Sequence, residues 1–196
     1  QFMSQLILLL MTITANTAYC DERALDYETI VYLAKTECKN ISPADVDEDL
    51  LWTLVEVEKK YNVPYKLRGM ILAAACTESG YNPRAKGDRK FSKNKKKPMA
   101  IGILQQWPIY EKMYNTVRTD PISAADSWMK HIVKMLPKVI KQCRYKSERR
   151  RWIAAWVTGI RYKKPGGRCN ETPKHLRLLN KWHRKAIIIS CEVPGC

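Results

Sequence analysis

Apolar residues recur at helical spacing along most of the chain, and runs that alternate apolar and polar positions are few. This periodicity predicts a mainly α fold. Helices are expected at about 24–36, from Ser42-Pro43 to Asn62, at 66–77, at 122–136, from Ser147 through Trp156, and from Thr172 through Trp182. Pro137 is expected to end the fourth of these, with 138–142 continuing only beyond a kink. Residues 84–106 leave room for a small β-hairpin.

The N-terminus is apolar and uncharged. Residues 1–19 carry no charge, and the apolar run within them, 6–11, is too short to span a bilayer. A run of this kind is typical of a signal peptide, so we expect a secreted or periplasmic protein. The alternative is a hydrophobic helix docked on the domain. The predicted organisation is a leader at 1–19, a helical extension at 20–47 and a single domain at 48–196.

Seven cysteines are spread along the chain without the spacing of a metal site. In an oxidising compartment they would form disulfides, but the pairing stays open, because six cysteines alone allow 15 arrangements. No metal and no other cofactor is predicted.

Charge is distributed unevenly along a chain whose net charge is +16. Residues 21–60 hold eleven acids against five bases, whereas 61–196 hold thirty bases against eight acids. A body this cationic should be attracted to an anionic cell wall or membrane surface. Nucleic acid is not expected as a partner, since no zinc-finger spacing, RNA-binding signature or helix-turn-helix is found.

A candidate catalytic group is Glu78, at the C-terminal end of the nearly all-apolar helix at 66–77. Apolar surroundings disfavour the charged form, so we expect burial to raise the pKa of Glu78. A carboxylic acid that stays protonated near neutral pH can donate a proton to a glycosidic oxygen. The alternative is a solvent-exposed Glu at a helix end. The three histidines, at 131, 175 and 183, have no ligand spacing and are expected to be surface or packing residues.

Two linked motifs, Glu-Ser-Gly-Tyr-Asn-Pro-Arg-Ala at 78–85 and Gly-Ile-Leu-Gln at 102–105, resemble the signatures of the soluble lytic transglycosylase family. The resemblance covers about residues 48–162. It implies a lysozyme-like fold, a monomer, and cleavage of the β-1,4 bond of bacterial peptidoglycan with Glu78 as acid and then base. A third signature is matched only loosely by Ala-Trp-Val-Thr-Gly at 155–159, where Val157 stands in place of an Asn. The glycan-binding residues predicted in this way are Ser79, Gln105, Gln106, Trp156 and Tyr162.

A single-acid reaction that leaves a 1,6-anhydro end is favoured, because the chain offers few candidates for a second catalytic carboxylate. Hydrolysis by two carboxylates needs a partner acid, and Asp88 is the one acid with an evident route to Glu78 by sequence. Two alternatives stay open: a hydrolase of the same fold, of lysozyme or chitosanase type, and a non-enzymatic cationic wall-binding protein.

Overall fold

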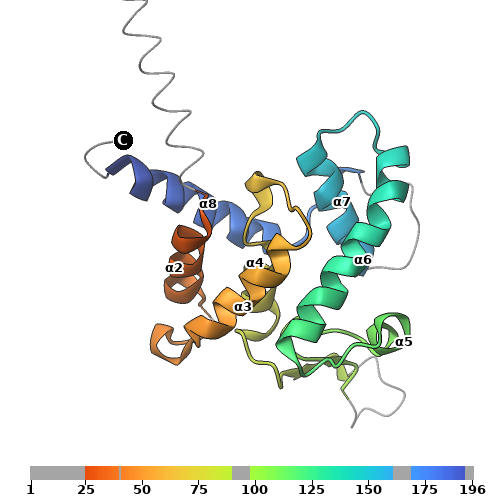
Figure 1. The fold of residues 1–196 in the computed structure, drawn as a ribbon, viewed down its shortest axis with the longest axis horizontal. Coiled ribbons are helices and arrows are strands. Elements are labelled where there is room, and N and C mark those ends of the chain that lie inside the picture. The colour runs from red at the N-terminus through yellow and green to blue at the C-terminus, as the bar shows by residue number, and fades with distance from the viewer. Residues whose placement is uncertain (1–24, 40, 90–97, 161–168, 193–196) are drawn as a thin grey trace, which may run out of the picture.

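A computed structural model describes residues 25–39, 41–89, 98–160 and 169–192 of the chain. The fold is mainly helical, as predicted (Figure 1). The helices, in chain order, are α2 (Tyr27–Glu37), η1 (Pro43–Asp45), α3 (Glu48–Lys59), η2 (Tyr65–Leu67), α4 (Met70–Ser79), α5 (Ile109–Tyr114), α6 (Pro121–Gln142), α7 (Glu148–Ile160) and α8 (His175–Glu192).

The predicted small hairpin is also present. Strand β1 (Lys86–Gly87) pairs antiparallel with β2 (Ala100–Ile101), and Gly87 lies opposite Ala100. The hairpin follows α4 directly, so it brings the Gly-Ile-Leu-Gln motif back beside the end of that helix.

Helix α4 lies at the centre of the fold, with α2 and α3 on one side and α6 and α7 on the other (Figure 1). It contacts α2, α3 and α8. All residues from Met70 to Cys76 are buried, which explains why this helix has no polar face. Gly80 ends the helix in the left-handed conformation, with φ 58°, and its N–H bonds back to the last turn.

The N-terminus of α4 is capped by a buried carboxylate from α3. Glu58 is 1% exposed, and its oxygens accept the N–H groups of Gly69 at 2.7 Å and Ile71 at 2.9 Å. The hydroxyl of Tyr27 donates to the same carboxylate at 3.1 Å. Burial raises the pKa of Glu58 to about 7, against the opposing effect of these hydrogen bonds.

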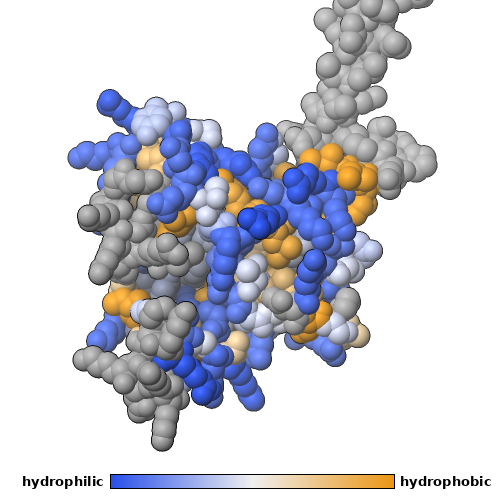
Figure 2. Space-filling view, turned by 180° about the vertical axis from the view of Figure 1, so that it is seen from behind, coloured by the Kyte–Doolittle hydropathy of each residue, from blue (hydrophilic) through white to orange (hydrophobic). Residues whose placement is uncertain are grey.

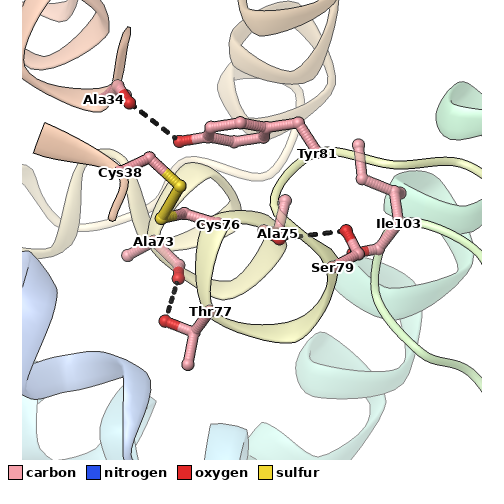
Figure 3. The surroundings of a disulfide bond; sticks show 9 residues. All are labelled: Ala34, Cys38, Ala73, Ala75, Cys76, Thr77, Ser79, Tyr81 and Ile103. Atoms are coloured by element: carbon pink, nitrogen blue, oxygen red, sulfur yellow. Dashed lines mark hydrogen bonds between the residues drawn. A yellow bond between two sulfur atoms is a disulfide. The ribbon is translucent and has the colours of Figure 1, made fainter. Parts of the chain in front are cut away.

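Two disulfides hold the described residues together. Cys38–Cys76 joins the end of α2 to α4 (Figure 3), and Cys143–Cys169 joins the end of α6 to the segment that leads into α8. Through the first bond, and through burial of Ile30 and Val31, α2 packs into the same core as the body. At the same end of α2, next to Cys38, Glu37 pairs with Lys181 and Lys185 of α8.

Two predicted boundaries are wrong, and one helix was not predicted. Asp47, not Ser42, caps α3, because its side chain accepts the N–H groups of Asp49 and Leu50 while Pro43 begins only a short 3-10 turn. Pro137 lies inside α6 and does not end it. Helix α5 was not predicted, since its six residues include no buried side chain and so carry no clear periodicity.

The predicted leader, 1–19, lies outside the described residues. Within the described ranges, no helix is both long and apolar enough to cross a membrane. Polar side chains dominate the face seen from behind, with smaller apolar patches between them (Figure 2).

Candidate active site

A groove of about 750 Å³ lies beside the C-terminal end of α4. Its walls come from α4, the hairpin and the motif after it, α5, α6, α7 and the segment before α8. The lining residues are Ala74, Glu78, Asp88, Leu104, Gln105, Gln106, Trp107, Ile109, Tyr110, Trp128, Val157, Glu171, Thr172, Pro173, Lys174 and His175.

Glu78 lies in this groove and not on the open surface. Its side chain is 22% exposed, and one oxygen, Oε1, carries both of its partners: His175 Nε2 at 2.5 Å and Lys174 Nζ at 3.0 Å. Burial alone would raise the pKa of Glu78, but the hydrogen bonds and charges of His175 and Lys174 outweigh it and lower the pKa. The predicted raised pKa is therefore wrong, because no residue near Glu78 in the chain indicated these two partners.

His175 lies 97 positions from Glu78 in the chain but directly against it in space. The imidazole is 3% exposed, and it stacks on the indole of Trp156 with ring centroids 5.6 Å apart and 6° between the planes. His131 and His183 are buried too, at 3% and 8% exposure. The expectation that His175 is only a surface or packing residue is thus corrected by its contact with Glu78.

Gln105 and Gln106, the two predicted glycan-binding glutamines, both line the groove. The Nε2 of Gln105 donates to the Gly102 carbonyl at 2.9 Å, which folds the side chain back over its own turn. Gln106 is 2% exposed and is held through Nε2 by the carbonyl of Ala124 and the hydroxyl of Ser127. Gln106 is therefore a fixed part of the groove floor, whereas Gln105 is partly accessible.

Ser79 and Trp156, which were predicted to bind glycan, are not among the residues that line the groove. The Ser79 hydroxyl donates to the backbone oxygens of Ile103 at 2.8 Å and Ala75 at 3.1 Å, so it ties the end of α4 to the Gly-Ile-Leu-Gln motif (Figure 3). Trp156 is fully buried, and its indole packs beneath His175 and edge-on against Trp128. The predicted direct contact of Ser79 and Trp156 with the glycan is thereby corrected: Ser79 supports the end of α4, and Trp156 supports His175. Tyr162 lies outside the described residues.

Two further carboxylates, Asp88 and Glu171, line the groove with Glu78. Asp88 lies in the hairpin and accepts the indole N–H of Trp107 at 3.0 Å. Glu171 is exposed and belongs to the segment before α8. Asp88 is thus on the groove as its position in the chain indicated. Glu171 was missed because it lies 93 positions from Glu78 in the chain.

Among the residues that the structure describes, no group of three or more His, Cys, Asp or Glu is placed to hold a metal ion. Comparison of the chain with protein-family models, with curated proteins and with solved structures found no match. A function for this chain therefore has to follow from the groove itself.

Proposed function

We propose that this protein cleaves the β-1,4 glycosidic bond between N-acetylmuramic acid and N-acetylglucosamine in bacterial peptidoglycan, with Glu78 as the acid and base. The observation that carries this proposal is a partly buried carboxylate inside a groove of about 750 Å³. The groove combines aromatic rings with polar side chains, a lining that suits a sugar chain. The motif resemblance at 78–85 and 102–105 points to the same bond.

The favoured reaction uses Glu78 alone. Glu78 gives a proton to the glycosidic oxygen as the bond from that oxygen to the anomeric carbon breaks, and the acetamido oxygen of the substrate bonds to that carbon. The Glu78 carboxylate then takes the proton of the sugar's 6-hydroxyl, and the oxygen of that hydroxyl attacks the same anomeric carbon. The acetamido group leaves, a 1,6-anhydro ring closes, and Glu78 ends protonated as it began.

Hydrolysis is the second candidate, because Asp88 and Glu171 line the same groove as Glu78. Either could activate a water as the partner of Glu78 in an inverting mechanism. The products separate the two reactions: a water-derived reducing end in hydrolysis, and an anhydro end in the single-acid reaction.

The same proposal includes export and attraction to the wall. The disulfides Cys38–Cys76 and Cys143–Cys169 are typical of an oxidising compartment, which supports a secreted or periplasmic protein. The net charge of +16 favours binding to an anionic wall or membrane surface, with the glycan strand as the substrate. We propose that the protein acts as a monomer and without a cofactor.

The test is digestion of purified peptidoglycan by the wild type and by Glu78→Gln, with the released ends identified by mass spectrometry. Anhydro ends that disappear in the variant are the expected result, and reducing ends that disappear would select the hydrolase. Equal release by both proteins, or no release by either, would reject Glu78 as the acid. Wall binding without any cleavage would favour the non-enzymatic cationic protein.

A further inference from the structure

The two partners of Glu78 bind the same oxygen. His175 Nε2 and Lys174 Nζ both contact Oε1, at 2.5 Å and 3.0 Å. Both of these ion pairs are therefore made through one oxygen of the carboxylate, and neither uses Oε2.

The two anchors differ in kind. Lys174 has a side chain that is 64% exposed, so solvent screens its charge and its long stem is free to move away. His175 is 3% exposed and is clamped by Trp156, which itself packs edge-on against Trp128. His175 is thus the anchor whose position is set by the core.

The position of His175 also determines which of its ring nitrogens donates a hydrogen bond. With Nε2 turned to a carboxylate oxygen, Nε2 carries the hydrogen and donates it. Its other ring nitrogen, Nδ1, is buried and has no hydrogen-bond partner among the described residues. The ring therefore makes one strong polar contact, and that contact is with Glu78.

The charged groups that line the groove with Glu78 come from three places. His175 is the first residue of α8, Lys174 and Glu171 lie in the segment before it, and Asp88 lies in the hairpin. Of these, His175 and Lys174 contact the Glu78 carboxylate and lower its pKa, and His175 has the larger effect of the two. The contact with His175 therefore influences both the orientation and the charge of this carboxylate.

We propose that His175 is a positioning residue for Glu78: its Nε2–H holds Oε1, so that Oε2 is the oxygen that exchanges protons with the glycan. This role rests on the proposed glycan cleavage. This role accounts for a buried histidine that lies 97 positions from Glu78 in the chain and yet contacts it in the groove. The contact opposes the protonation of Glu78 that the first half of the reaction needs, and it favours the carboxylate, which is the form that takes the 6-hydroxyl proton in the second half.

The test combines an NMR titration of the ¹³C-labelled Glu78 carboxyl with the pH profile of end release from peptidoglycan. His175→Phe keeps a ring that can stack on Trp156 but has no donor, and His175→Gln keeps a donor but no charge. The matched control is His183→Gln, since His183 is also buried in α8 but contacts the Arg68 carbonyl at 2.9 Å instead of Glu78.

In His175→Phe we expect the pKa of Glu78 to rise, because burial is then opposed by Lys174 alone. Any limb of the pH profile that Glu78 sets should move to higher pH with it, and the rate should fall about 10- to 100-fold through misplacement of the carboxylate. His175→Gln should restore part of the rate, and His183→Gln should change neither the titration nor the profile.

An unchanged titration and pH profile in both His175 variants, with release that still depends on Glu78, would overturn the inference alone. Absence of release by the wild type, with the titration shift still present, would instead reject the proposed function and leave the pairing of His175 with Glu78 in place. Thermal unfolding of each variant identifies any that fails to fold. If His175→Phe fails to fold, the titration and pH profile of His175→Gln test the inference.

Discussion

The Glu58 carboxylate accepts the backbone N–H of Ile71 at 2.9 Å, at one end of the helix whose other end carries Glu78. A buried acid thus replaces the usual exposed side-chain cap. Because Glu58 is 1% exposed, its ionisation is linked to the stability of the whole fold.

Stability should fall as the pH rises from about 5 to 8. The pKa of Glu58 is about 7 in the folded protein, above its ordinary 4.5, so over this interval the folded state retains a proton that the unfolded chain has released. The folded state is favoured where that proton stays bound, and the advantage is lost as the pH rises through about 7. The shift corresponds to at most about 3 kcal/mol. Urea unfolding at pH 5 and pH 8 measures it.

Glu58→Gln is the control for that measurement. It cannot titrate, so its free energy of unfolding should lose this part of the pH dependence, although the variant should be less stable at both pH values. The same pH dependence in wild type and variant would show that Glu58 is not its source.

Replacement of the other groove carboxylates should separate the two candidate reactions. If Glu78 acts alone, Asp88→Asn and Glu171→Gln should each lower the rate of end release by less than about 10-fold. If one of them is the base in hydrolysis, its removal should cost about 100-fold or more. The rates and the chemical form of the ends are both measured on peptidoglycan. A large loss in one variant, with reducing ends from the wild type, would replace the single-acid reaction by hydrolysis.

Gly87→Ala should weaken substrate binding without unfolding the protein. An added Cβ would lie 2.3 Å from the Gln105 Oε1, and the far end of that side chain can move, so Gln105 should leave its place in the groove. We expect a several-fold higher KM with a nearly unchanged Tm. Gly102→Ala is the contrasting variant, because its Cβ would lie 1.8 Å from the Arg118 carbonyl at a φ of +86°. It should lower Tm strongly. An unchanged KM in Gly87→Ala would exclude Gln105 from binding.

The sequence was informative where the signal was local. The apolar run before Glu78 predicted α4, and the break at 80–83 predicted where it ends. The motif at 102–105 predicted a second groove segment. Pro137 was a misleading signal, since α6 continues through it.

The environment of Glu78 could not be predicted in the same way. Its partner His175 is 97 positions away, and neither residue has a neighbour in the chain that indicates the other. The predicted direction of the Glu78 pKa shift was wrong for that reason. The apolar residues before Glu78 predicted its burial, which raises the pKa, but the contacts that lower the pKa depend on tertiary packing. Trp156 was placed on the groove for a related reason, because an aromatic residue in a motif does not reveal which face of its helix is buried.

Removal of the Cys38–Cys76 bond should destabilise the fold substantially. The two cysteines are 38 positions apart, and closing a loop of that length contributes about 2–4 kcal/mol. Cys38→Ser with Cys76→Ser should therefore lower the free energy of unfolding by this amount, as measured by urea denaturation. The wild type under reducing conditions should change in the same direction. Equal stability of the double variant and the oxidised wild type would contradict this.

That disulfide also links the stability of the helix that carries Glu78 to the redox state of its surroundings. Cys76 precedes Glu78 by two residues on α4, so the bond that fastens this helix to α2 lies next to the proposed acid. It forms readily only where thiols are oxidised, outside the reducing cytosol. In a reducing compartment the helix that carries Glu78 would therefore be held less firmly than in an oxidising one. The proposed role of Glu78 would then depend on the redox state of a single pair of sulfur atoms.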